Sequence, residues 1–245
     1  MKAMILAAGR GQRMLPLTNT TPKPLIKLNN KFLIEYVIEN LKNAGITEIV
    51  INIYHLKEQI KHALKDGEKW GINIKYSEES ELLDTGGGIL QAIQSNLIGK
   101  EPFIVLSSDI ITNFDIHKLL SKLSKLSKSS ESSESYKSSE LDNLNNLAHL
   151  ILVPNPYFKP YGDFSLDNHY LTLPSKNYAR NYTYANIGIF DPKFFTNVQE
   201  KILPLSKIIK QYLQDKTQQI TAEVYDGLWQ NIGTLEDLKG ETINV

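Results

Sequence analysis

Apolar residues in the first half of the chain fall into short continuous runs, and amphipathic stretches separate these runs. Within the stretches, apolar residues recur every three or four positions, which is the repeat of a helix with one buried face. Such alternation is typical of parallel strands joined by crossover helices. The pattern predicts strands at residues 4–8, 48–54, 72–76 and 103–106, and helices at residues 32–44, 56–64 and 86–96. We therefore expect an α/β fold whose ligands bind beyond the carboxyl ends of the strands.

The second half of the chain lacks this strict alternation. Strand-like runs occupy residues 148–153, 185–190 and 222–225, and a helix is predicted near residues 205–213. Between the halves, residues 121–146 are dominated by Ser, Lys, Glu and Asn, and they contain too little apolar surface to offset the entropy lost on ordering. We expect a flexible insertion there, with a helical first part, in a single domain of residues 1–245.

Composition excludes several classes of function. Lys plus Arg equals Asp plus Glu at 27 each, so the chain lacks the basic field of a generic nucleic-acid binder, and we expect no nucleic-acid partner. Cysteine is absent, which excludes disulfides, thiolate metal sites and cysteine nucleophiles. No apolar stretch approaches the roughly 18 residues of a membrane span, so we expect a cytoplasmic protein without a membrane partner. The sequence leaves the oligomeric state open, a homo-oligomer included.

The most informative segment follows the first predicted strand. Gly9 and Gly11 stand directly after it, and glycines at this place let backbone N–H groups approach a phosphate chain closely. Arg13 and Lys23 supply positive charge, and the prolines on both sides of Lys23 keep its backbone extended. The segment fits neither the dinucleotide fingerprint, which needs Gly or Ala where Met14 stands, nor the P-loop, which needs a Gly-Lys-Ser/Thr ending. On these residues alone, a tight turn with an exposed loop lysine is the alternative.

Residues 6–18 and 22–25 together resemble the signature of the sugar-1-phosphate nucleotidyltransferases. The resemblance implies the nucleotide-diphospho-sugar transferase fold, a Rossmann-like three-layer α/β sandwich with a mostly parallel mixed sheet. Residues 1–115 would then form the nucleotide-binding half, and residues 148–245 the sugar-binding half. The nucleotide-binding residues implied by the resemblance are Leu6, Ala8, Gly9, Gly11, Arg13, Lys23, Thr85, Gly86 and Gly87.

Residues 84–89 resemble the Thr-Gly-Gly segment of this family, which meets the nucleobase and ribose at the start of a helix. Glycines leave room there for a flat base to lie against the backbone. A plain turn before a helix is the alternative.

Asp109 follows the strand predicted at 103–106, where the family has an aspartate that binds magnesium, although a lone aspartate after a strand is equally suited to a turn. Residues 229–234 resemble the family's Trp-x-Asp-x-Gly-Thr segment, whose aspartate is the second metal ligand, and Asn231 replaces that aspartate here. An amide offers a neutral oxygen without the charge. The resemblance thus implies Mg²⁺ as cofactor, Asp109 and Asn231 as its protein ligands, and Arg13, Lys23 and Asp109 as catalytic residues.

The candidates for the sugar side are Asn155, Asp163, Asn186 and Gly188. Hydroxyl-rich ligands need several fixed donors and acceptors, which Asn and Asp provide. Each of these residues taken singly also suits an ordinary loop or strand position.

Within the family, residues 85–89, 149–156 and 162–164 most resemble the N-acetylmuramic acid 1-phosphate uridylyltransferases of cell-wall recycling. The implied partners are small molecules, a nucleoside triphosphate such as UTP and a sugar 1-phosphate. Other substrate pairs stay open: glucose 1-phosphate with TTP or UTP, mannose 1-phosphate with GTP, and phosphocholine with CTP. A nucleotide-binding regulatory protein that has lost its chemistry is the alternative outside the enzymes, and Asn231 is the residue that favours it.

Overall fold

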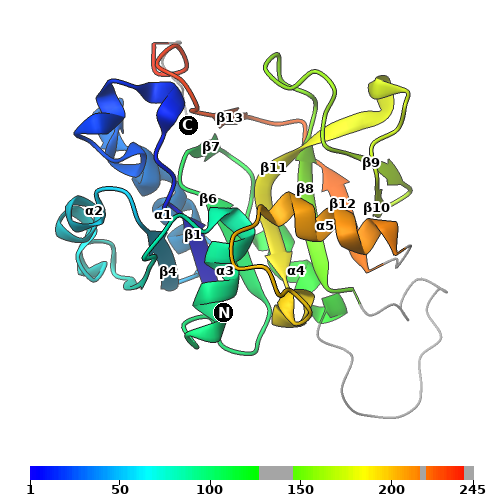
Figure 1. The fold of residues 1–245 in the computed structure, drawn as a ribbon, viewed down its shortest axis with the longest axis horizontal. Helices are drawn as coiled ribbons and strands as arrows, with labels where there is room; N and C mark the ends of the chain where they lie inside the picture. Colours follow the sequence, from blue (N-terminus) through cyan, green and yellow to red (C-terminus); the bar gives the residue numbers. More distant parts are fainter. Residues whose placement is uncertain (127–145, 216–218, 240–245) are drawn as a thin grey trace.

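The computed structural model describes residues 1–126, 146–215 and 219–239 of the chain, and these residues form a mixed sheet with helices on both faces (Figure 1). From one edge to the other, the strands of this sheet are β5 (Asn73–Glu78), β4 (Glu48–Ile53), β1 (Lys2–Leu6), β6 (Phe103–Ser107), β11 (Asn181–Phe190), β8 (Ala148–Val153), β12 (Ile220–Val224), β10 (Tyr170–Thr172) and β9 (Phe164–Asp167). The helices are α1 (Leu33–Asn43), α2 (Lys57–Leu64), α3 (Asp84–Gln94), α4 (His117–Leu126) and α5 (Leu205–Gln214). Two small sheets pair β2 (Lys27–Leu28) with β3 (Lys31–Phe32) and β7 (Ile110–Thr112) with β13 (Trp229–Asn231).

The expected α/β sandwich with a mixed sheet is confirmed, and its parallel part is the half predicted from the strand and helix alternation. Strands β5, β4, β1 and β6 are parallel, with Met4 of β1 opposite Val50 of β4 and Val105 of β6. Beyond β6 the sheet becomes mostly antiparallel, although β12 pairs with β8 in parallel. The change follows from the connections, because β9 and β10 are joined by a tight hairpin and a hairpin can only join antiparallel strands.

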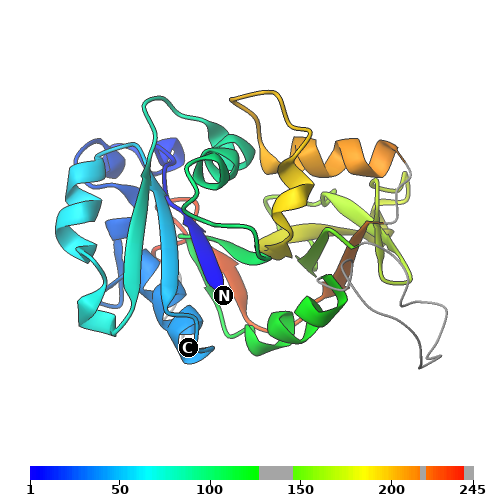
Figure 2. The same cartoon turned by 90° about the horizontal axis from the view of Figure 1, so that it is seen from below.

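Alternate residues of each central strand face opposite sides, and each side has its own core. Ala3 and Ile5 of β1 pack in a cluster with residues of α1, α2 and α4. Met4 packs on the other side in a cluster with residues of α3 and α5. In Figure 2, α3 and α5 accordingly lie on one side of the sheet and α4 on the other. This is the three-layer arrangement expected for strands buried on both faces.

The predicted bounds of the first strand need correction. The strand predicted at residues 4–8 ends at Leu6, because the N–H of Ala7 donates to the side-chain oxygen of Asn52 in β4 and not to a backbone carbonyl of that strand. The insertion was predicted to begin with a helix, and residues 121–126 do belong to helix α4. Residues 127–145, on which the rest of that expectation rests, lie outside the described residues.

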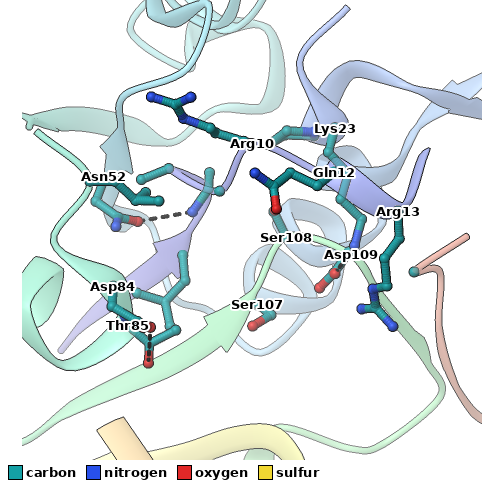
Figure 3. A pocket seen from close by; sticks show the side chains of 18 residues that line it. Arg10, Gln12, Arg13, Lys23, Asn52, Asp84, Thr85, Ser107, Ser108 and Asp109 are labelled. Atoms are coloured by element: carbon teal, nitrogen blue, oxygen red, sulfur yellow. Dashed lines mark hydrogen bonds and ion pairs between the residues drawn. The ribbon is translucent and has the colours of Figure 1, made fainter. Parts of the chain in front are cut away.

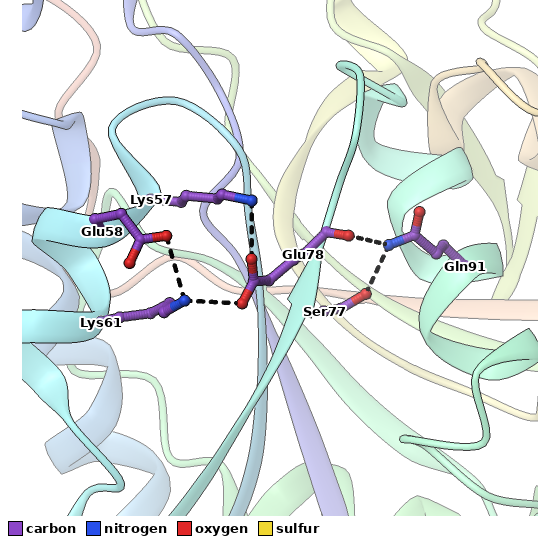
Figure 4. A network of polar contacts seen from close by, with 6 residues as sticks. All are labelled: Lys57, Glu58, Lys61, Ser77, Glu78 and Gln91. Atoms are coloured by element: carbon purple, nitrogen blue, oxygen red, sulfur yellow. Dashed lines mark hydrogen bonds and ion pairs between the residues drawn. The ribbon is translucent and has the colours of Figure 1, made fainter.

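Ion pairs and hydrogen bonds connect the helices on both faces of the sheet to the outer strand β5 (Figure 4). Glu78 of β5 accepts ion pairs from Lys57 and Lys61 of α2, at 2.8 and 3.0 Å. On the other side of the strand, the side-chain amide of Gln91 in α3 donates to the backbone of Glu78 and to Ser77. The hydrogen bonds from Lys57 and Lys61 lower the pKa of the Glu78 carboxyl. These groups are largely exposed, so the network orients the helices more than it stabilises the fold.

No helix in the described part of the chain is long and apolar enough to cross a membrane.

Candidate active site

A cavity of about 600 Å³ lies beyond the carboxyl ends of β1, β4 and β6 (Figure 3). The residues around it come from the loop after β1, the ends of β4 and β6, the start of α3 and the turn after β13. They are Leu6, Ala7, Ala8, Gly9, Arg10, Gly11, Gln12, Arg13, Lys23, Pro24, Asn52, Leu82, Asp84, Thr85, Ser107, Ser108, Asp109 and Gly233. This is the edge of the sheet at which the parallel strand pattern predicted a ligand site.

The segment from residue 7 to residue 13, here the glycine loop, forms one wall of the cavity. Gly11 has a φ of 63°, a conformation that few other residues adopt without strain. A Cβ atom at Gly11 would lie 2.8 Å from the methyl group of Thr18, whose hydroxyl donates to the Gly11 carbonyl. The buried Met14 then fixes the end of the loop in a small core with Ile111 and Ile232. The loop is therefore held on both sides while its backbone faces the cavity.

Asn52 holds the start of this loop, and the sequence reasoning had missed it. Its side-chain oxygen accepts from the N–H of Ala7 at 2.9 Å, and its amide donates to Glu79 at 2.7 Å. The second oxygen of Glu79 accepts from the N–H of Leu83 at 3.0 Å, just before α3. Burial raises the pKa of the Glu79 carboxyl. The buried chain from Ala7 through Asn52 and Glu79 to Leu83 thus fixes the glycine loop relative to the start of α3.

Lys23 and Asp109 form an ion pair at the centre of the cavity. Lys23 lies in a short 3₁₀ turn, Lys23–Leu25, that follows the extended Pro22. Asp109 follows β6, where the N–H of Ser108 still donates to the carbonyl of Leu6 at 3.0 Å. Both side chains are mostly buried, with 13% and 17% of their surface exposed. The predicted convergence of the glycine loop, Lys23 and Asp109 is therefore observed.

Arg13 lies on the rim of the same cavity. Its guanidinium lies against Gly233, where a Cβ atom would be 3.0 Å from the nearest guanidinium nitrogen. The side chain is exposed, and it makes no ion pair with any residue that the structure describes. Its charge is therefore available to an anionic ligand.

The two predicted magnesium ligands lie next to each other. Asn231 pairs with Ile110 in the β13–β7 ladder, and the N–H of Ile232 donates to the backbone carbonyl of Asp109 at 2.9 Å. The side-chain oxygen of Asn231 is buried and accepts no hydrogen bond. Of the two, Asp109 is among the residues that line the cavity and Asn231 is not, so their closeness is that of the two backbones. A carboxylate and an unpaired amide oxygen are both ligands that suit Mg²⁺, which prefers oxygen and shares its coordination with phosphates. The described residues contain no group of three or more His, Cys, Asp or Glu that would hold a metal, so a phosphate ligand would have to complete the site.

The glycines of α3 do not line the cavity. The N–H groups of Gly86 and Gly87 donate to the carbonyl of Leu203, at 2.9 and 3.1 Å. A Cβ atom at Gly87 would lie 2.2 Å from the carbonyl oxygen of Lys201. These glycines therefore make room for the chain segment before α5, and the residues of α3 that line the cavity are Asp84 and Thr85, at its start.

A second cavity of about 160 Å³ adjoins the first, and Leu6 and Thr85 line both. Its other lining residues are Val105, Lys159, Asp163, Phe164, Tyr184, Asn186, Leu205 and Ser206. Asp163 and Asn186 therefore both line a cavity next to the first one, and their binding of a sugar stays a prediction.

The other two sugar-side candidates line neither cavity. The amide of Asn155 donates to the carbonyls of Pro160 and Asn181, and its oxygen accepts from Thr183, so the side chain is fully occupied by its own loop. Gly188 lies inside the sheet, where a Cβ atom would meet Leu150 at 3.0 Å. Both residues have a structural explanation.

Comparison with known proteins gives the family. The family model described as nucleotidyl transferase matches residues 2–138. This chain belongs to the nucleotidyl transferase family. It is 39% identical over 241 residues to the N-acetylmuramate alpha-1-phosphate uridylyltransferase of Neisseria meningitidis, an alignment that covers 98% of this chain and 96% of that one.

More distant relatives agree with this assignment. The mannose-1-phosphate guanyltransferase of Saccharomyces cerevisiae is 30% identical over 99% of this chain and 64% of its own. Among solved structures, a Bacillus anthracis chain assigned as a glucose-1-phosphate thymidylyltransferase, in complex with sucrose, superposes with a TM-score of 0.78 at 20% identity, covering 98% of this chain and 92% of that one. The sequence-based assignment to the sugar-1-phosphate nucleotidyltransferases is confirmed.

Asn52 also offers a test of how the cavity is built. Asn52→Ala leaves the N–H of Ala7 and the carboxylate of Glu79 buried with one partner fewer, so we expect the free energy of unfolding to fall by about 2–4 kcal/mol. Urea unfolding measures this change. Asn73→Ala is the matched control, since the Asn73 side chain is exposed and donates only to Glu48, and we expect it to cost less than about 0.5 kcal/mol. Equal losses in the two variants would contradict the proposed role of Asn52.

Proposed function

We propose that this protein transfers the uridylyl group of UTP to N-acetylmuramic acid 1-phosphate, in peptidoglycan recycling. The observation that carries the proposal is the pair of adjoining cavities, one with a glycine loop and cationic side chains, the other with fixed polar side chains, which meet at Leu6 and Thr85. Identity to the Neisseria meningitidis enzyme over nearly the whole of both chains supports this choice of substrates. Because UTP is a cytoplasmic metabolite, we place the reaction in the cytoplasm.

In the proposed reaction, UTP occupies the first cavity. The backbone of residues 8–11 and the guanidinium of Arg13 bind the triphosphate, and the uridine lies toward Thr85. The sugar 1-phosphate enters the second cavity. There Asp163 accepts hydrogen bonds from its hydroxyl or amide groups, and Asn186 donates to or accepts from its polar groups. We assign residues 1–115 to the nucleotide side and residues 148–245 to the sugar side of one domain, whose sheet runs through both.

The chemical step is an in-line displacement at the α-phosphorus. A phosphate oxygen of the sugar 1-phosphate forms the new bond to this phosphorus, and the bond to the β-phosphate bridging oxygen breaks, so that pyrophosphate leaves with the electron pair. No covalent intermediate with the protein is needed. Lys23 and Arg13 lower the barrier by neutralising the charge that the phosphates accumulate, and the two cavities align the reactants.

We propose Mg²⁺ as the cofactor, with Asp109 and Asn231 as the residues that would hold it. When bound, Mg²⁺ would neutralise phosphate charge and draw triphosphate oxygens to the end of β6. The ion pair between Lys23 and Asp109 has to open in this arrangement, because Lys23 then serves the phosphates and Asp109 the metal. The pair compensates two mostly buried charges, either of which would be costly without a partner.

The proposed function is tested by incubating the protein with Mg²⁺ and pairs of substrates while pyrophosphate release is recorded. We expect UTP with N-acetylmuramic acid 1-phosphate to be turned over with the highest kcat/KM. The competing pairs are glucose 1-phosphate with TTP or UTP, mannose 1-phosphate with GTP, and phosphocholine with CTP. Preference for one of these by more than about tenfold would reassign the substrate, and absence of pyrophosphate with every pair would favour a binding protein without catalysis.

Removal of either cation tests the electrostatic part of the mechanism. We expect Arg13→Ala and Lys23→Ala each to lower kcat/KM by a factor of about 100 or more, because each removes a charge that stabilises the transition state. Lys75→Ala, which removes an exposed lysine on β5, serves as the control and should keep normal turnover. Thermal unfolding should accompany the assays, since Lys23→Ala leaves Asp109 without its ion-pair partner. A folded Lys23→Ala variant with near-normal turnover would refute the role of Lys23.

A separate pair of variants tests the metal ligands. Asp109→Asn leaves no carboxylate at either proposed ligand position, so the Mg²⁺ concentration for half-maximal turnover should rise by at least about tenfold. Asn231→Asp restores a charge at the second position and should lower that concentration. An unchanged Mg²⁺ titration in both variants would remove Asp109 and Asn231 from the metal site.

A further inference from the structure

The segment between β8 and β9, residues 154–163 and here the sugar-side loop, carries large exposed aromatic side chains. Tyr157 is 78% exposed, Tyr161 63% and Phe158 39%. The same loop contributes Lys159 and Asp163 to the second cavity. The position of this loop therefore decides where two of the polar groups of the second cavity lie.

Both ends of the sugar-side loop are fixed on β11. At one end, the amide of Asn155 donates to the carbonyl of Asn181 at 3.0 Å. At the other end, Asp163 accepts from the N–H of Tyr184 at 3.0 Å, and its second oxygen pairs with Lys159 at 2.6 Å. These contacts hold the ends of the loop and leave its tip, at residues 157 and 158, to be held by something else.

The tip contacts a part of the chain 80 residues away in the sequence. The hydroxyl of Tyr157 donates to one carboxylate oxygen of Asp237 at 3.3 Å. The other oxygen of Asp237 accepts from the N–H groups of Gly233 and Thr234, at 2.8 and 2.7 Å. Gly233 in turn lines the first cavity beside Arg13. One carboxylate thus joins the sugar-side loop to the turn that borders the nucleotide side.

The charge of Asp237 favours a Tyr157 hydroxyl that keeps its proton and donates it in the hydrogen bond. The negative charge of Asp237 raises the pKa of the Tyr157 phenol, which keeps the hydroxyl in the protonated form that can donate. The ring of Tyr157 packs edge-on against Phe158, with centroids 5.4 Å apart, and this contact does not depend on the hydroxyl.

We propose that Tyr157 is a positioning residue for the acceptor substrate. By donating to Asp237, it holds the sugar-side loop against the turn at residues 233–237 and thereby fixes Lys159 and Asp163 at the second cavity. The identity of the acceptor as a sugar 1-phosphate rests on the proposed function. The contact itself is independent of it.

Tyr157→Phe tests the proposal, because it removes the hydroxyl and keeps the ring on Phe158. We expect the KM for N-acetylmuramic acid 1-phosphate to rise about fivefold, the effect of one lost exposed hydrogen bond on ground-state binding. The KM for UTP and kcat should change by less than about twofold, since Asp237 still holds Gly233 and Thr234 through its other oxygen. Tyr178→Phe is the matched control, because the Tyr178 side chain is 55% exposed and its hydroxyl makes no hydrogen bond within the described residues.

Hydrogen exchange on the substrate-free protein gives a readout that does not depend on the reaction. Amides of residues 157–159 and 161–163 should exchange faster in Tyr157→Phe than in the parent protein, and at the parent rate in Tyr178→Phe. Faster exchange without turnover of any sugar 1-phosphate would support the contact and refute the proposed function. Unchanged exchange would overturn the proposal. Equal rises in the KM for UTP and the KM for N-acetylmuramic acid 1-phosphate would overturn it as well, because Tyr157 would then affect the binding of both substrates and not of the acceptor alone.

Discussion

Parallel pairing of β4, β1 and β6 brings the carboxyl ends of three strands to one edge of the sheet, and the candidate active site is built from residues at or just beyond these ends. The glycine loop comes directly after β1, Asn52 stands near the end of β4, and Asp109 lies just past β6. In a sheet with another register these groups would be separated by the spacing of strands and residues. The parallel register is therefore the constraint on which the glycine-loop wall of the first cavity and the Lys23–Asp109 pair both depend, and with them the proposed triphosphate site.

A second constraint acts between the two halves of the chain. The first cavity uses the parallel half of the sheet, and the second uses the antiparallel half, with Leu6 and Thr85 common to both. The chain closes this arrangement from its C-terminal side, where Gly233 lies beside Arg13 and Asp237 contacts the sugar-side loop. The first cavity is thus bordered by residues from the beginning, the middle and the end of the described chain, which suits the proposed reaction, because that reaction has to align two separate substrates.

Much of this could be predicted from the sequence, because local patterns carry it. The strand and helix periodicity of the first half predicted the parallel core, and the resemblance of residues 6–18 and 22–25 to a known family signature predicted the glycine loop, Lys23 and Asp109 as parts of one site. Asn52 also had a signal, a lone polar residue in an apolar strand that ends at the ligand edge, but its bonds to Ala7 and Glu79 depend on packing that periodicity does not specify. The glycines at positions 86 and 87 predict space for a nucleobase. In the structure, a segment more than 100 residues further along the chain fills that space. A contact between such distant segments cannot be predicted from a local sequence pattern. The amide of Asn155 similarly suggests a ligand residue, whereas it closes its own loop.

The most direct measurement of the central claim is a crystal structure of the protein with Mg²⁺ and a UTP analogue that cannot be cleaved between the α- and β-phosphates. We predict that the triphosphate lies along residues 8–11, that Lys23 has left Asp109 for a phosphate oxygen, and that the α-phosphorus lies beside Leu6 and Thr85 where the second cavity begins. A nucleotide bound elsewhere, or one bound with its α-phosphorus far from that boundary and the Lys23–Asp109 pair intact, would contradict this arrangement.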